Sequence, residues 1–260
     1  MIKILITNDD GIFAEGIKIL ADIARDLGEV YVVAPDSQKS AVSHGITIHS
    51  PIKVEKVDFP VDVAGAWSIG STPADCIRIA LNNLLDEKPD LILSGINNGT
   101  NYGGDILYSG TVAGAIEGYQ YKIPSVALSL DGKNFDVCRC HLGNFLNHYI
   151  YTAMDNKYVL NVNIPSCTTE DFKGVSYAKL SRTGQYPFYF SEKKISSKLS
   201  SYELRLAGSG EIDENSDIYF VKQGYISVTP IVPNFENFEY AEHLIGTGLF
   251  QETVYAGNED

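Results

Sequence analysis

Two adjacent carboxylates follow the first strand-like run of the sequence. The run is residues 2–7, IKILIT, and Asn8, Asp9, Asp10 and Gly11 come directly after it. Carboxylate oxygens are ligands that hard divalent cations such as Mg²⁺ and Mn²⁺ prefer. Asp-Asp-Gly is also an ordinary turn sequence, because Asp accepts from local N–H groups and Gly permits a positive φ. Residues 8–11 are therefore compatible with two interpretations: an ordinary turn, or a turn whose two aspartates supply part of a cation site.

Two further loops supply oxygen donors. Residues 34–45, APDSQKSAVSHG, follow the second strand-like run, and residues 94–111, SGINNGTNYGGDILYSGT, follow the third. Ligands in open parallel sheets bind beyond the carboxyl ends of the strands. A long polar loop inside a compact domain is typical of function. The sequence therefore predicts an all-oxygen cation site where the three loops meet. The candidate oxygen donors of the second loop are Asp36, Ser37, Ser40 and Ser43. The same loop offers His44, although His44 and His49 also fit ordinary polar contacts.

An anion site is predicted next to these donors. The segment YSGTV, residues 108–112, opens a helix rich in small residues, and Ser109 and Thr111 bring two hydroxyls. Backbone N–H groups and the dipole at a helix N-terminus favour a bound anion. A dication beside a phosphate-sized anion site indicates metal-assisted hydrolysis of a phosphoester, in which the metal polarises the phosphoryl oxygen and lowers the pKa of a bound water.

Other phosphate-handling classes lack their motifs in this sequence. GxxxxGK[ST] is absent, which excludes a P-loop enzyme, and no GxGxxG follows the first strand. A receiver domain needs an aspartate at the end of the third core strand, where Ser94 stands. Haloacid-dehalogenase-like phosphatases carry Asp-x-Asp, which Asp9-Asp10-Gly11 does not provide.

The elements that must position these loops alternate between strand and helix. Continuous apolar runs joined by helical periodicity indicate a parallel sheet covered on both faces. Thr72 as N-cap, Pro73 at the first helical position and Asp75 as a capping-box acid mark one helix start. Gly28 marks a helix end. We expect strands at 2–7, 30–35, 90–95, 124–130 and 158–165, helices at 14–28, 72–85, 110–122 and 138–154, and antiparallel strand at 45–57.

The fold class expected is α/β, a Rossmann-like three-layer sandwich with a mostly parallel sheet, a β-hairpin extension and a C-terminal tail. We expect one domain over residues 1–260. Its core covers about 1–170 and 217–232, the aromatic, Ser-rich, β-leaning extension covers about 171–216, and the tail covers 233–260.

Composition limits the partners. The chain of 260 residues has a formal net charge of −13, whereas binding of polymeric nucleic acid normally needs a basic stripe. Cys76, Cys138, Cys140 and Cys167 form no CxxC pair, as expected of reduced thiols. No apolar run is long enough to span a membrane, and Asn8 breaks the N-terminal run before it could serve as a signal peptide. We expect a cytoplasmic protein without membrane or nucleic-acid partners.

The loops together resemble the survival protein E (SurE) family. The matching stretches are ILITNDDG, VVAPDSQKSA, STPADC, PDLILSGINNGTNYGGDILYSGTVAGAIEG, LNVNIP and DIYFVKQGYISVTPI, between residues 2 and 231 and in the family's order. The resemblance implies a metal-dependent 5′/3′-nucleotidase, a hydrolase acting on nucleoside monophosphates, with short polyphosphate as a further substrate of some members. Two departures are Ser71 in place of the usual glycine of GTPADC and Gly114 in place of the usual alanine; neither removes a ligand.

The resemblance also implies roles for individual residues. It implies one divalent cation per subunit, Mg²⁺ or Mn²⁺, and a choice of Ser40 and Asn97 among the oxygen donors. The implied metal ligands are Asp9, Asp10, Ser40 and Asn97; Asp9 and Asp10 are also catalytic; the implied phosphate contacts are Asn8, Asn101, Ser109, Gly110 and Thr111.

The expected activity is a phosphomonoesterase that uses metal-activated water. No side chain stands out as general base, so either Asp9 doubles in that role or metal-bound hydroxide suffices. The alternative is a non-catalytic metal- or nucleotide-binding module, against which the intact ligand set argues. The aromatic residues of about 171–217 and of the tail NFENFEYAEHLIGTGLF, residues 234–250, predict a homo-oligomer interface, in a homodimer or homotetramer.

Overall fold

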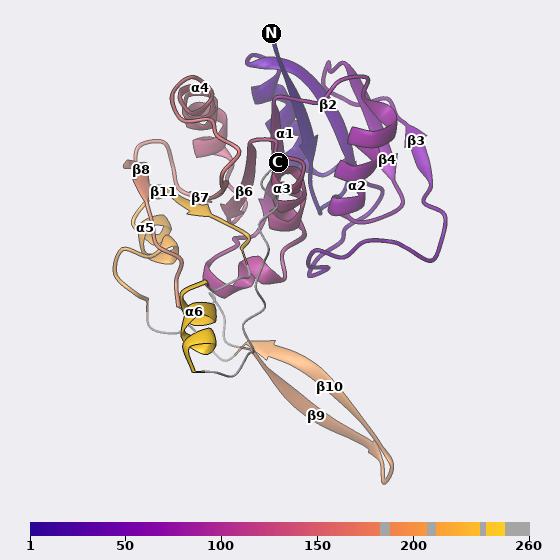
Figure 1. Cartoon of the computed structure of the whole chain (residues 1–260), viewed down its shortest axis with the longest axis vertical. Coiled ribbons are helices and arrows are strands. Elements are labelled where there is room, and N and C mark those ends of the chain that lie inside the picture. The colour runs from indigo at the N-terminus through magenta and orange to yellow at the C-terminus, as the bar shows by residue number, and fades with distance from the viewer. Residues whose placement is uncertain (183–187, 207–211, 235–237, 248–260) are drawn as a thin grey trace.

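A nine-stranded sheet forms the centre of the protein. The structure is a computed structural model that describes residues 1–182, 188–206, 212–234 and 238–247 (Figure 1). The strand order is β3-β4-β2-β1-β5-β6-β7-β11-β8. The bounds are β1 Ile2–Thr7, β2 Gly28–Pro35, β3 Val54–Lys56, β4 Gly65–Ile69, β5 Leu91–Asn98, β6 Ser125–Asp131, β7 Val159–Pro165, β8 Gly174–Tyr177 and β11 Tyr225–Ile231.

Helices cover both faces of this sheet. The helices are α1 Glu15–Ala24, α2 Pro73–Ile79, α3 Gly110–Gln120, α4 Gly143–Thr152, α5 Asp217–Lys222 and α6 Phe238–Gly246, with π-helical segments at Ala80–Leu84 and Cys138–Leu142 and a 3-10 helix at Gly103–Leu107. Alternate residues of β1 point to opposite faces. Ile4 and Ile6 pack in the cluster that contains residues of α1 and α4, whereas Leu5 packs with residues of α2. The three-layer α/β class expected from the sequence is confirmed.

The strands that carry the polar loops run in the same direction. β1 pairs in parallel with β2 and with β5, and β5 pairs in parallel with β6. The carboxyl ends of β1, β2 and β5 therefore meet at one edge of the sheet. Within the nine-stranded sheet, the described antiparallel pairs lie away from these loops: β3 pairs with β4 on one side, and β11 pairs with β7 on the other.

The helix starting after Ser71 begins as expected. The side chain of Thr72 accepts a hydrogen bond of 3.2 Å from the backbone N–H of Asp75, which confirms the N-cap, and Pro73 is the first helical residue. The carboxylate of Asp75 instead accepts from Ser71 Oγ at 2.5 Å and from Thr47 N at 2.9 Å. Asp75 thus fastens the segment before β3 to α2, besides marking the helix start.

Some expected boundaries are wrong. Helix α1 ends at Ala24, and Gly28 is the first residue of β2. A Cβ at position 28 would lie 2.4 Å from Ile2 O, so close packing on β1 requires this glycine. Of residues 45–57, only Val54–Lys56 form a strand. The short helix α5 and the strand β4 are further elements that the sequence patterns did not indicate.

Residues 171–216 contain two different structures. Strand β8 belongs to the main sheet, where it pairs in parallel with β11. Strands β9, Phe188–Ser196, and β10, Leu199–Leu206, form a separate antiparallel hairpin that extends away from the body of the molecule (Figure 1). The described tail includes α6, while residues 235–237 and 248–260 lie outside the described part of the chain.

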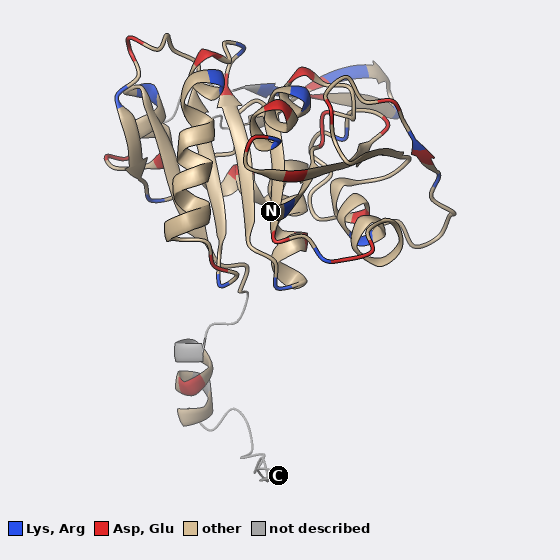
Figure 2. Cartoon of the chain, turned by 90° about the horizontal axis from the view of Figure 1, so that it is seen from above, with Lys and Arg blue, Asp and Glu red and all other residues tan. Residues whose placement is uncertain are grey.

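Charged residues are spread over the molecule. Figure 2 shows Lys and Arg interspersed with Asp and Glu. The sequence has 33 Asp and Glu against 20 Lys and Arg, which gives the net charge of −13. Among the described helices, none has both the length and the apolarity to cross a bilayer.

Candidate active site

A tight turn after β1 separates the directions of Asp9 and Asp10. Asn8 closes this turn with two hydrogen bonds to Gly11, from Nδ2 to the carbonyl oxygen at 2.9 Å and from the Gly11 N–H to Oδ1 at 3.2 Å. Gly11 has φ of +106°, a conformation that a residue with a Cβ rarely adopts. Asp9 faces the start of α3, and Asp10 faces the end of β5.

Asp9 packs against the N-terminus of α3. Its exposed fraction is 5%, and Thr111 Oγ1 donates a hydrogen bond of 2.5 Å to its Oδ1. A Cβ at Gly110 would lie 2.8 Å from Asp9 Cβ and 2.9 Å from Asp9 Oδ2. Only a residue without a side chain lets the helix start come this close to the carboxylate.

The environment of Asp9 disfavours its charged form. Burial raises the pKa of Asp9 to about 6, the hydrogen bond from Thr111 works in the opposite direction, and the nearby charge of Asp10 raises the pKa further. Within the described ranges, neither aspartate forms an ion pair with a basic side chain. A buried carboxylate of this kind gains most from a cation placed beside it.

Asp10 and Asn97 lie at the end of β5. The backbone N–H of Asn98 donates to Asp10 Oδ2 at 2.9 Å, and Gln38 Nε2 lies 3.5 Å from Asp10 Oδ1. Asn97 donates its Nδ2 to Gly99 O at 2.7 Å, which leaves its amide oxygen as the acceptor of that side chain. This amide oxygen is the atom that a cation would use.

Ser40 lies on a loop that is tied to the other two. The backbone N–H of Lys39 donates to Asp9 O at 2.7 Å, and that of Ser43 donates to Tyr108 O at 3.0 Å. Ala41 and Ser43 have φ of +53° and +54°, the left-handed region that non-glycine residues seldom occupy. Ser40 is exposed and lies in the sequence between these two hydrogen-bonded residues, Lys39 and Ser43.

The donor set fits a hard dication. In the described part of the chain, no group of three His, Cys, Asp or Glu side chains could hold a metal. The implied ligands comprise two such residues, with a hydroxyl and an amide completing the set. All four donors are oxygens, which suits Mg²⁺ or Mn²⁺ and not Zn²⁺.

Three of the residues expected to contact phosphate lie at the start of α3. Ser109 is the N-cap, and its Oγ accepts from Val112 N at 3.1 Å, while Gly110 and Thr111 face Asp9. The amide of Asn101 instead donates to Ser129 Oγ at 2.7 Å, and the amide of Asn8 closes its own turn. Phosphate contact stays a prediction for all five.

A buried polar network fixes the third loop, and the sequence patterns did not single it out. Asn163 Oδ1 accepts from Asn101 N at 2.9 Å, and Asn161 Nδ2 donates to Asn101 O at 2.9 Å. Fully buried Asp217 accepts from the backbone N–H groups of Gly103 and Ser181 at 2.9 and 3.0 Å. Polar residues at alternate positions of the otherwise apolar run LNVNIP were the available signal.

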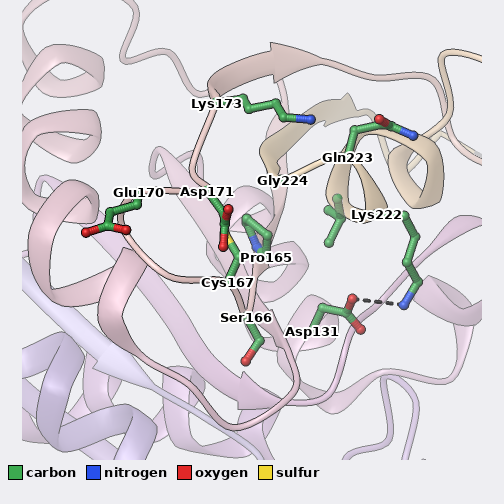
Figure 3. A pocket seen from close by; sticks show the side chains of 11 residues that line it. Asp131, Pro165, Ser166, Cys167, Glu170, Asp171, Lys173, Lys222, Gln223 and Gly224 are labelled. Carbon is green, nitrogen blue, oxygen red and sulfur yellow. Dashed lines mark hydrogen bonds and ion pairs between the residues drawn. The ribbon is translucent and has the colours of Figure 1, made fainter.

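Two cavities open at this end of the sheet. A pocket of about 300 Å³ begins at the Asp10 carboxylate; it is lined by Asp10, Ala14, Glu15, Gly16, Gln38, Asn98, Lys133 and Phe135. A second, of about 430 Å³, lies near the ends of β6 and β7, where Lys222 Nζ reaches Asp131 Oδ2 at 3.0 Å (Figure 3). None of the residues expected at the active site lines the second cavity.

Known proteins are similar to this chain in sequence. A family model described as Survival protein SurE matches residues 4–186. A 5′-nucleotidase SurE of Clostridium botulinum (strain ATCC 19397 / Type A) is 40% identical over 247 residues, covering 92% of this chain and 96% of the relative. One of Prochlorococcus marinus subsp. pastoris is 40% identical over 246 residues, covering 90% and 91%.

A solved structure agrees with the fold. The crystal structure of the SurE protein from Aquifex aeolicus matches with a TM-score of 0.83 and 33% sequence identity, and the match covers 95% of this chain and 99% of that one. The sequence match and the structural match extend over nearly the whole chain, so the protein belongs to the SurE family.

Proposed function

We propose that this protein is a divalent-metal-dependent 5′-nucleotidase, a hydrolase that converts nucleoside monophosphates to nucleoside and phosphate. The observation that carries the proposal is the buried Asp9 carboxylate, which lies against the N-terminus of α3 and has a pKa of about 6. A cation placed there would compensate this buried negative charge, and the N-terminus of α3 would favour a phosphate bound next to that cation. The names of the relatives, 5′-nucleotidase SurE, support the same activity.

In this proposal Asp9, Asp10, Ser40 and Asn97 hold the cation. When bound, Mg²⁺ or Mn²⁺ supplies Lewis acidity and a water of lowered pKa. The N–H groups at Gly110 and Thr111 orient the phosphoryl oxygens and stabilise the charge that develops on them. Asp9 is the candidate to accept a proton from the attacking water.

The pocket beside Asp10 suits the nucleoside part of the substrate. It offers the ring of Phe135, the amide of Gln38 and the ammonium of Lys133, and its volume of about 300 Å³ is at the lower end of the range for small-molecule sites. A phosphate anchored at α3 could reach this pocket with either a 5′- or a 3′-linked ribose. We therefore include nucleoside 3′-monophosphates, and also short polyphosphate, as substrates to be tested.

We also propose that the protein acts in the cytoplasm and that it forms a homo-oligomer. All four cysteines are free thiols, as in proteins of a reducing compartment. The hairpin β9–β10 exposes Phe188, Phe190, Tyr202 and Leu204, each more than half accessible. Exposed apolar patches of this kind mark interaction sites, and a second copy of the chain is the partner proposed here.

Release of phosphate from nucleoside monophosphates in the presence of Mn²⁺ tests the proposal. We expect Asp10→Asn and Asn97→Ala to lose activity by about a hundredfold or more. Asp36→Asn is the matched control, because Asp36 is an exposed carboxylate of the second loop that is not among the implied ligands. Binding of Mn²⁺ and nucleotide without turnover by the unmodified protein would favour the non-catalytic module instead.

A further inference from the structure

Glu117 is a buried carboxylate that lies two turns beyond the start of α3. Its side chain is 2% exposed. His44 Nε2 lies 2.6 Å from its Oε2, and Arg78 Nε lies 2.8 Å from its Oε1. The contact with Arg78 is an ion pair without hydrogen-bond geometry, so among the described residues only His44 hydrogen-bonds to the Glu117 side chain.

The two partners of Glu117 come from different elements. Arg78 is in the last turn of α2, whereas His44 belongs to residues 36–47, here called the Ser40 loop. A buried charge needs partners, because removal of one leaves the charge desolvated and uncompensated. Glu117 therefore holds α2 on one side and the Ser40 loop on the other, while its own helix carries Gly110 and Thr111.

The Ser40 loop has an unusual backbone that needs such an attachment. Ala41 and Ser43 have left-handed φ values of +53° and +54°. Strained residues of this kind persist only where the surroundings determine them. After Ser40, the loop is held first at Ser43, whose Oγ donates to Leu107 O at 2.7 Å, and then by His44 at Glu117. Its last residues are held by α2, where Thr72 Oγ1 donates to Gly45 O at 2.8 Å and Asp75 accepts from Thr47 N at 2.9 Å.

We propose that His44 and Glu117 are positioning residues that set the Ser40 loop against the start of α3. Through them one helix holds both the phosphate end of the site, at Gly110 and Thr111, and the hydroxyl implied as a metal ligand, at Ser40. The part of this inference that concerns metal affinity rests on the proposed function. The attachment of the loop does not, and it can be tested without metal.

The test compares His44→Ala with Arg78→Ala. Each removes one partner of Glu117, but only the first removes an attachment of the Ser40 loop, the one between the bonds at Ser43 and those at Gly45 and Thr47. In metal-free protein, hydrogen–deuterium exchange of residues 36–45 should be at least fivefold faster in His44→Ala than in the unmodified protein. In Arg78→Ala it should stay within twofold. Thermal unfolding and circular dichroism establish that both variants are folded.

A spectroscopic measurement then connects the loop to the site. Titration of Mn²⁺ followed by electron paramagnetic resonance should show about tenfold weaker binding in His44→Ala, with little change in Arg78→Ala. His44→Gln, which keeps a hydrogen-bond donor, should recover part of the affinity and of the exchange protection. Equal exchange of residues 36–45 in His44→Ala and the unmodified protein, or equal acceleration in both alanine variants, overturns the proposal. If the unmodified protein binds no Mn²⁺, the proposed metal site fails, and the exchange result still decides the role of His44.

Discussion

Thr111 Oγ1 lies 2.5 Å from Asp9 Oδ1, so the first turn of α3 is hydrogen-bonded to the first carboxylate after β1. The contact joins two segments that are 102 positions apart in the sequence. It also selects the orientation of the Asp9 carboxylate, which is almost completely enclosed. The carboxylate and the helix N-terminus thus form one preorganised surface.

The stability of the metal-free protein should fall as pH rises from about 4 to about 6. The Asp9 pKa is about 6 in the folded protein against 3.8 without burial, so the folded state retains a proton that the unfolded chain has released. Asp9→Asn removes this effect. We expect its stabilisation relative to the unmodified protein to be about 2 kcal/mol larger at about pH 7.5 than at about pH 4.5.

Urea unfolding of both proteins at the two pH values, without divalent metal, measures this difference. The same variant should be inactive at either pH, which separates stability from function. An Asp9→Asn effect that does not change between the two pH values would mean that the carboxylate is not destabilised by its burial.

Gly110→Ala should lower kcat by about a hundredfold, because displacement of a reacting group by about 1 Å has an effect of this size. Its Cβ would lie 2.8 Å from Asp9 Cβ, so either Asp9 or the helix start must move. Gly104→Ala is the matched control, since a Cβ there meets nothing within 4 Å. Steady-state kinetics should show the control within about twofold of the unmodified protein; similar losses in both would contradict a role for close approach at Gly110.

Gln38→Ala and Lys133→Ala should reduce kcat/KM for nucleoside monophosphates by about tenfold, through a higher KM. Both residues line the pocket that begins at Asp10 and that we assign to the nucleoside. Phenyl phosphate, which has no nucleoside, should be hydrolysed at an unchanged rate. If both substrates lose activity equally, the side chains support the catalytic centre and do not recognise the nucleoside.

A double substitution, Phe190→Ser with Leu204→Ser, should shift the protein to smaller assemblies. The two residues are directly opposed in the β9–β10 ladder and are 66% and 54% exposed, so they form one apolar face of the hairpin. Tyr189→Ser is the control on the opposite face, where Tyr189 pairs with Arg205. Light scattering at micromolar concentration gives the mass, and a monomeric unmodified protein would contradict the proposed interface.

The sheet and the placement of the loops could be predicted from the sequence because they depend on local patterns. Continuous apolar runs such as ILIT identify buried parallel strands, and the order of strands and helices brings their carboxyl ends to one edge. The Thr72 cap was also readable, because N-capping is a local interaction. Metal ligation by Asp9, Asp10, Ser40 and Asn97 stays a prediction.

The roles of several individual residues could not be predicted, because they depend on contacts between segments that are far apart in the sequence. Gly28 has the appearance of a helix end, but its absent Cβ serves the approach of β2 to Ile2. Asp217 appears as one acid among many, although its partners are 36 and 114 positions away. His44 fits an ordinary polar residue until the structure places Glu117 against it.

The position of β11 in the sheet has a consequence for synthesis of the protein on the ribosome. β8 is joined to the sheet through β11, which lies between it and β7, so β8 has to wait until residues 225–231 emerge. Asp217, which holds Gly103 in the third loop, emerges only slightly earlier. The first seven strands can assemble while the chain is still growing, but the loop before α3 acquires the Asp217 anchor only after residue 217 has emerged. A nascent chain therefore carries the carboxylates of Asp9 and Asp10 well before Asp217 can hold the loop that lies before α3.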